Sequence, residues 1–157
     1  MPLFDAEIRH RTGEEDSLTA KLFGTLGLLD RSAILAPFLK SLGMRLSDSE
    51  AASLNLSLWK PYGGMEPDVV IETSKQLAFI EVKLDSSLSA DYLEKMVRAG
   101  SRSNRNFSIF VLTRDYNAPQ ALGEVQKKFS SDYLRVRIQW LRWHTIYMAL
   151  KETSRRH

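Results

Sequence analysis

The sequence predicts one α/β domain spanning residues 1–157, built on a mixed β-sheet with helices on both faces. Its length suits a single hydrophobic core. Several short segments alternate apolar and polar residues, as half-buried strands do, and others repeat apolar residues at helical spacing. In the second half of the chain these strand and helix patterns take turns, which is typical of β-α-β units.

Two helical segments open the chain. Thr12 and Glu15 have the spacing of a capping box, and leucines recur at helical spacing behind them, at positions 18, 22, 26 and 29. A second helical pattern begins at Asp30 or Ser32 and runs to Leu42. It contains Pro37, so we expect this helix to be kinked or to begin late. Gly43 is a suitable stop.

Three strand patterns follow, over residues 54–58, 68–73 and 77–84. The short connections between them predict a meander of neighbouring antiparallel strands.

The rest of the chain alternates helices and strands. We expect a helix capped by Ser87 or Ser89 and another capped by Asn117. Strands are expected over residues 107–113 and 136–141, and a final helix over residues 145–152. The two β-α-β connections predict parallel pairing.

Composition excludes some classes of protein and favours others. There is no cysteine, so disulfides and thiolate metal sites are excluded. The sequence contains no apolar run of the roughly 20 residues that span a bilayer, and we expect a cytoplasmic protein with no membrane partner. Through Glu94 the chain has 9 Lys and Arg against 15 Asp and Glu, and after it 13 against 4. This asymmetry favours a polyanionic partner.

Asp68, Glu81 and Lys83 form the candidate site. Residues two apart on a strand share a face, so Glu81 and Lys83 point the same way while their neighbours form an apolar face. A tight connection lets Asp68 face Glu81 across the strand pair. Two adjacent carboxylates repel each other unless a cation lies between them, and Mg²⁺ or Mn²⁺ suits such oxygen ligands. The alternative is that Asp68 caps a turn and that Glu81 and Lys83 are a solvated edge pair.

The pattern Pro67-Asp68, twelve residues, then Glu81-Val82-Lys83 resembles the motif of the PD-(D/E)XK nuclease superfamily. The resemblance covers roughly residues 15–113. It implies a restriction-endonuclease-like core of helix, three strands, helix and strand (αβββαβ), to which this chain adds helices and a final strand. It further implies that Asp68, Glu81 and the Val82 carbonyl bind the metal and that Lys83 is catalytic.

Members of several of these families also supply an acidic residue from the first helix, and Glu15 is our candidate. Glu14 and Glu7 are the competing residues, and Glu15 has an alternative role in its capping box. Some families place a Gln or Tyr on the helix after the Lys-bearing strand. Here that helix offers Tyr92, which suits a core position equally well.

The predicted activity is metal-dependent hydrolysis of DNA by an endonuclease, with DNA preferred over RNA on the resemblance alone. Arg98, Arg102 and Arg105 follow the site in the chain and are predicted to contact phosphates. A homodimer would allow both strands of a duplex to be cut. Two rival hypotheses remain: an inactive nuclease-fold module that binds nucleic acid or a protein partner, and a metal-free α/β protein.

Overall fold

The computed structural model describes residues 13–84, 87–114, 117–130 and 136–155. Its centre is a five-stranded sheet in the order β1-β2-β3-β4-β5. The strands are β1 (Asn55–Leu58), β2 (Val69–Glu72), β3 (Gln76–Lys83), β4 (Asn106–Thr113) and β5 (Val136–Arg142). The first three pair antiparallel and the last three pair parallel, so the predicted mixed sheet is confirmed.

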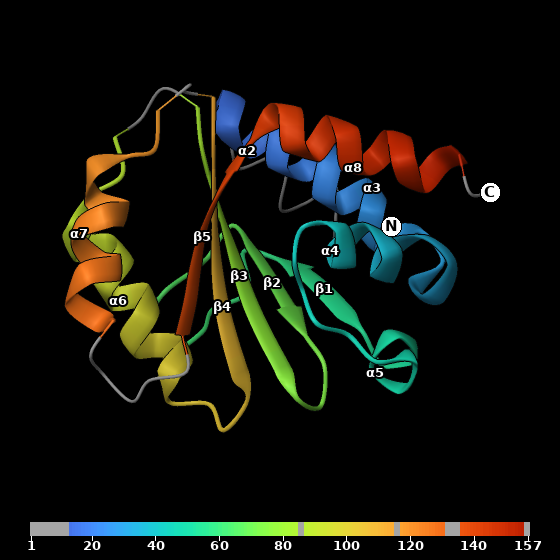
Figure 1. Cartoon of the computed structure of the whole chain (residues 1–157), viewed down its shortest axis with the longest axis horizontal. Helices are drawn as coiled ribbons and strands as arrows, with labels where there is room; N and C mark the ends of the chain where they lie inside the picture. Colours follow the sequence, from blue (N-terminus) through green and yellow to red (C-terminus); the bar gives the residue numbers. More distant parts are fainter. Residues whose placement is uncertain (1–12, 85–86, 115–116, 131–135, 156–157) are drawn as a thin grey trace.

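Helices cover both faces of this sheet, as predicted (Figure 1). One face carries α6 (Ala90–Ser101) and α7 (Gln120–Phe129). The other carries α2 (Glu14–Thr19), α3 (Thr25–Leu28), α4 (Ala36–Ser41) and α8 (Trp143–Arg155), with the short α5 (Asp48–Ala52) at one end. The order α2, β1, β2, β3, α6, β4 is that of the αβββαβ core.

The core lies in two layers because alternate residues of a buried strand point to opposite faces. On β3, Ala78, Ile80 and Val82 pack with the α2–α4 and α8 layer. Leu77 and Phe79 pack with the α6 and α7 layer. Because β3 is buried on both sides, the charged residues Glu81 and Lys83 at its end are exceptions among its mostly apolar side chains.

Several local predictions need correction. The structure does not use Asn117 as a helix cap, because α7 begins at Gln120 with Pro119 in the N-cap position. The first helical stretch is interrupted by a π-helical turn at Ala20–Gly24. A second π turn, Arg31–Leu35, precedes Pro37, which lies in the first turn of α4 where proline is tolerated. The prediction missed α5, although Ser47 and Glu50 form a full capping box.

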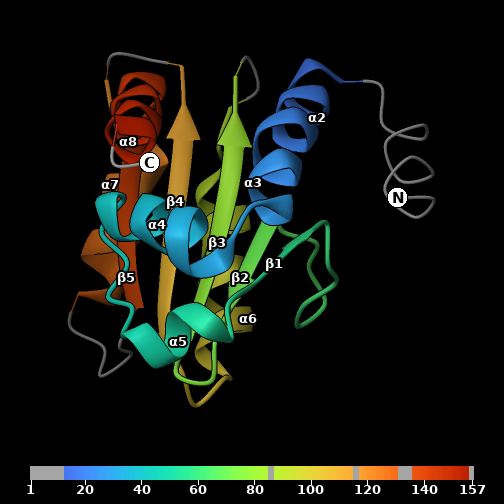
Figure 2. The same cartoon turned by 90° about the vertical axis from the view of Figure 1, so that its right-hand side faces the viewer.

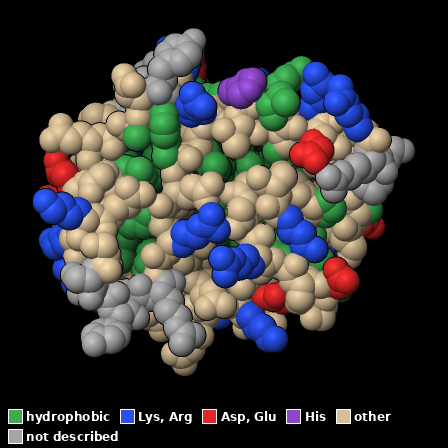
Figure 3. Space-filling view, in the orientation of Figure 1, with side chains coloured by type: hydrophobic (Ala, Val, Ile, Leu, Met, Phe, Trp, Pro, Cys, Tyr) green, Lys and Arg blue, Asp and Glu red, His purple; other side chains and the backbone are tan. Residues whose placement is uncertain are grey.

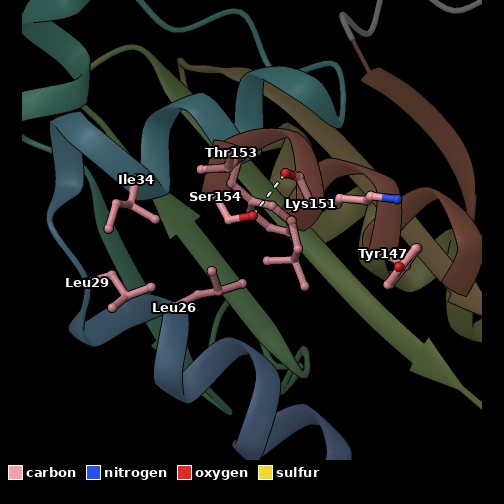
Figure 4. Close-up of a pocket in the computed structure, with 9 residues that line it drawn as sticks. Leu26, Leu29, Ile34, Tyr147, Lys151, Thr153 and Ser154 are labelled. Carbon is pink, nitrogen blue, oxygen red and sulfur yellow. Dashed lines mark hydrogen bonds between the residues drawn. The ribbon is translucent and has the colours of Figure 1, made fainter. Parts of the chain in front are cut away.

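A pocket of about 600 Å³ opens between the end of α3, the turn that follows it and α8. Figure 4 shows Leu26, Leu29 and Ile34 on one side of it and the α8 residues Tyr147 and Lys151 on the other. Its lining is mostly apolar, and it lies away from the predicted carboxylates. No single helix within the described ranges is long and apolar enough to cross a membrane. One pair, Glu14–Leu28 with Arg31–Ser41, meets the length and composition test only across a bend of 119°.

Candidate metal centre and nuclease site

Asp68 and Glu81 lie opposite each other at the end of the β2–β3 pair. Val69 pairs with Ile80, so the next step of the antiparallel ladder places Asp68 against Glu81. The Asp68 backbone is held on its other side, because its carbonyl accepts a hydrogen bond from the Trp59 N–H at 3.1 Å. Its side-chain Oδ2 accepts the Val82 N–H at 2.8 Å. The structure therefore brings together the two carboxylates that the sequence singled out.

Lys83 shares the face of Glu81, and its Nζ lies 2.9 Å from Glu81 Oε1. Glu81 is only 2% exposed, so the pair is not the solvated edge pair of the alternative interpretation. Both side chains lie on the α6 side of the sheet. There the Tyr92 hydroxyl donates to Glu81 Oε2 over a long 3.4 Å. Tyr92 is thus a neighbour of the site as well as a residue packed beside the α6 core.

Burial and neighbouring acidic groups disfavour the charged form of both carboxylates. Burial, followed by the charge of Asp68, raises the pKa of Glu81 to about 7, although Lys83 and Tyr92 oppose the shift. Burial also raises the pKa of Asp68, and the Val82 N–H and the Lys83 charge only partly offset this. A carboxyl with this pKa beside a second acid is typical of functional sites.

The pKa values of the neighbouring Lys83 and Tyr92 are raised as well. Burial alone would lower the pKa of Lys83, but its contact with Glu81 and the charges of Asp68 and Glu15 outweigh burial and raise it. Lys83 therefore stays an ammonium group near neutral pH. Burial and the negative charge of Glu81 raise the pKa of Tyr92, which therefore stays a hydrogen-bond donor.

The first described helix adds an acid to this end of the sheet. Glu15 Oε2 accepts the Leu84 N–H at 2.6 Å, directly after β3 (Figure 2 shows α2 beside the end of β3). The N-cap of α2 is Gly13, without a side-chain cap, while Thr12 lies outside the described residues. Of the two competitors, Glu14 is exposed and Glu7 lies outside the described residues.

Asp16 is a neighbour that the prediction missed, since its charge helps to raise the pKa of Asp68. The signal was present in the sequence as the acidic run that contains it, Glu14 to Asp16. Glu15, Asp68 and Glu81 thus lie close together at this end of the sheet, and Lys83 is the one cation in this group of four residues. A positive ligand would relieve the imbalance.

The carboxylate oxygens are the donor atoms that hard cations prefer, but they do not converge on a common position. Within the described residues, no three Asp, Glu or His side chains are arranged as a ready metal-binding group. Asp68 and Glu81 are adjacent, and the Val82 N–H points to Asp68. Because the N–H and C=O of one strand residue point to the same side, the Val82 carbonyl is directed there too. Two carboxylates with waters suffice for Mg²⁺, so the donor set fits that ion.

The three arginines predicted to contact phosphates are not brought to this site. Arg105 lies just before β4, whose first residue pairs with Gln76 at the start of β3, and Lys83 is at the other end of β3. Its guanidinium binds Glu72 and the Tyr62 hydroxyl instead. Arg102 caps the end of α6, at the same far edge. Arg98 lies over the Phe129 ring at 5.9 Å. Chain order misled here because α6 carries the chain back along the full length of the sheet.

Basic side chains gather at another place on the surface. On the face shown in Figure 3, Lys and Arg side chains cluster below the centre of the view. A polar pocket of about 300 Å³ lies at the start of the parallel strands, with Arg45, Gln76, Asn106, Ser108 and Arg137 among its lining residues. The Arg137 guanidinium donates to the Gly43 carbonyl at 2.6 Å. This pocket is separate from the carboxylates, at the opposite end of the sheet.

Comparisons with known proteins do not assign a function to this chain. No family model matches the chain, and none of the curated proteins matches its sequence. A search of solved structures relates it to SfsA from Pyrococcus furiosus, in a structure described as a complex with Ca²⁺. The sequence identity is 16% and the TM-score 0.45, over 80% of this chain and 57% of that one. The chain thus spans a little over half the length of that protein.

Proposed function

We propose that this protein is a divalent-metal-dependent nuclease that hydrolyses phosphodiester bonds in DNA, acting as an endonuclease. The observation that carries the proposal is the pair of adjacent carboxylates, Asp68 and Glu81, with the Glu81 carboxyl nearly inaccessible and paired to Lys83. Such a pair is unfavourable for folding, and burial with like charge is the reason. An ordinary structural role gives no reason to retain it.

Asp68 and Glu81 are the residues that would hold the metal, with the Val82 carbonyl beside them and Glu15 approaching from α2. Mg²⁺ or Mn²⁺ suits this set of oxygen donors. When bound, the metal would supply Lewis acidity toward the phosphate and lower the pKa of water.

Lys83 is the proposed catalytic residue. Its ammonium lies beside the carboxylates, where it can orient the attacking water or stabilise negative charge that develops on the phosphate. Because its pKa is raised, it contributes a positive charge rather than a base. Tyr92 donates to Glu81 and is a positioning residue in this scheme.

The choice of DNA as substrate rests on the resemblance of Pro67-Asp68…Glu81-Val82-Lys83 to the PD-(D/E)XK motif. The topology and the placement of the acid on α2 agree with that resemblance. A homodimer would place two such sites on a duplex. The rival proposal is a module that has kept the fold and uses its surface for binding alone.

The test is to incubate the protein with supercoiled plasmid, linear, branched and single-stranded DNA, each with Mg²⁺, Mn²⁺ or EDTA. We expect metal-dependent nicking or cleavage and a rise in melting temperature with either metal, since a ligand that binds only the folded state stabilises it. Stabilisation by metal without cleavage of any substrate would favour the binding module. Neither effect would favour the metal-free protein.

A further inference from the structure

A second set of polar residues lies on the same edge of the sheet as the carboxylates. Lys83 pairs in register with Thr113, and Thr113 pairs with Arg142. Residues in register on parallel strands share a face, so all three lie on the face of Glu81. Neighbouring strands are about 4.8 Å apart. Arg142 therefore lies two strands away, about 10 Å from Lys83 along the ends of the strands.

Arg142 is exposed but its position is well defined. Its guanidinium lies over the Trp140 ring, with 5.6 Å between the guanidinium carbon and the ring centroid. A hydrogen bond holds the indole in place, because Trp140 Nε1–H donates to Thr113 Oγ1 at 2.9 Å. Thr113 is 2% exposed, which anchors this chain of contacts in the protein.

The guanidinium has no carboxylate partner in the part of the chain that the structure describes. Arg105, by contrast, uses its donors on Glu72. A guanidinium has five N–H donors, and stacking on a ring leaves those donors open to an anion. The helices α6 and α7 both begin at this edge, and their N-terminal dipoles add positive potential there (Figure 1). The surroundings suit a phosphate.

We infer that Arg142 binds a backbone phosphate of the substrate strand, and that this strand crosses the C-terminal ends of β3, β4 and β5. The inference rests on the proposed function for the position of the cut, at Asp68 and Glu81. A stacked strand rises 3.4 Å per nucleotide, so a separation of about 10 Å places this phosphate within about three nucleotides of the cut. The substrate is thus a polynucleotide. A short diester with a single phosphate could not make this contact.

Binding is measured without cleavage, by fluorescence anisotropy of a labelled single-stranded 12-mer DNA in EDTA at several salt concentrations. Affinity falls as salt rises, and losing one phosphate contact makes the plot of log affinity against log salt less steep by about 0.7. The same loss weakens binding about fivefold at 0.1 M salt. We expect this for Arg142→Gln. Arg142→Lys keeps the charge and should retain most of the slope. The matched control is Arg155→Gln, an exposed arginine at the far end of α8. It should leave the slope unchanged.

A kinetic comparison sharpens the inference. With Mn²⁺, Arg142→Gln should raise KM for the 12-mer and leave kcat largely intact. It should cleave bis(p-nitrophenyl) phosphate, which has a single phosphate, as fast as wild type.

The two proposals fail in different ways. A wild-type slope in Arg142→Gln, with an unchanged melting temperature, would overturn the inference while leaving cleavage standing. A reduced slope in a protein that cleaves nothing would support the Arg142 contact and remove the nuclease. Wild-type protein that does not bind the 12-mer at low salt would overturn the Arg142 contact. Equal loss in Arg155→Gln would assign the effect to overall charge and overturn it as well.

Discussion

Glu72 and Glu81 lie on neighbouring strands at opposite ends of the same sheet, and their surroundings differ in sign. Glu72 forms ion pairs with Lys60 and with Arg105, whose two terminal nitrogens both lie 3.2 Å from Glu72 Oε1. Burial raises the pKa of Glu72, but these two cations outweigh burial and the pKa is lowered. Glu81 has one cation and a second carboxylate beside it, and its pKa is raised to about 7.

The contrast separates a carboxylate with a structural role from the one that we propose binds metal. The environment of Glu72 favours its ionised form, so the residue stabilises the folded protein at neutral pH. Glu81 is destabilised as an anion by the same fold that holds it in place. Retaining such a residue is explained when a ligand supplies the missing positive charge. Substitutions at Glu81 and its neighbours, and at Glu72 and its partners, test this difference.

The largest effect is expected for Asp68→Asn. The amide oxygen can still accept the Val82 N–H, so the local structure is retained while the charge is lost. Metal-induced stabilisation should disappear, and cleavage should fall by about a thousandfold or more, since metal catalysis contributes several kcal/mol. The metal-free variant should melt no lower than wild type, because a like charge beside Glu81 is gone. Assays of plasmid nicking and thermal melting measure both. Retained metal stabilisation would remove Asp68 from the metal site.

Lys83→Ala should lower kcat by about a hundredfold or more, within the range for a positioned acid, base or charge. Metal binding should persist, because the carboxylates remain and a competing cation has been removed. The matched control is Lys60→Ala, which removes an ammonium that pairs with Glu72 rather than with Glu81 and should leave cleavage unchanged. Equal loss of activity in both variants would indicate a general effect on folding rather than chemistry at Lys83.

A smaller effect is expected for Glu15→Gln. Glutamine can still accept the Leu84 N–H, so the melting temperature should change little. Removing a charge near the ligands should weaken metal affinity or activity about tenfold, as changes around metal sites commonly do. Titration of Mn²⁺ by thermal shift gives the affinity. An affinity equal to that of wild type would leave Glu15 with its hydrogen bond to the strand end and no role in metal binding.

The smallest effect is a slope of stability with pH in the metal-free protein. Glu81 has a raised pKa, so between its usual value of 4.5 and about 7 the folded state holds a proton that the unfolded state has lost. Its contribution to stability is therefore present below pH 4.5 and is lost as pH rises through 7. The lowered pKa of Glu72 acts at more acidic pH, where its contribution is lost as pH falls.

Melting in EDTA at pH 5.5 and pH 8 distinguishes the two residues. Wild type should melt lower at pH 8, by roughly a few degrees for a domain of this size. Glu81→Gln should flatten this dependence, and Glu72→Gln should keep it. If the melting temperature of Glu81→Gln still depends on pH as in wild type, another group is responsible for that dependence.

Much of the site followed from strand parity in the sequence. A period of two places Glu81 and Lys83 on one face, and the short connection after β2 returns the chain antiparallel, so that Asp68 meets Glu81. Glu72 shares that parity with Asp68, but its distance along the strand excluded it from the site. The same local rules predicted the five strands and the parallel pairing of the last three. They predicted helix boundaries less well, since Pro119 rather than Asn117 precedes α7.

Only the tertiary structure decided which charges meet. Arg105 follows Lys83 by only 22 residues in the chain, yet α6 returns it to the far end of the sheet, where it pairs with Glu72. Arg142 is more distant in sequence and lies in the row of Lys83, because parallel strands align their ends across the sheet. Sequence patterns report the local period of the backbone, whereas electrostatics depends on distances through space. Parity therefore determined the face of Glu81, and the packing of β2 and α6 against β3 determined its charge environment.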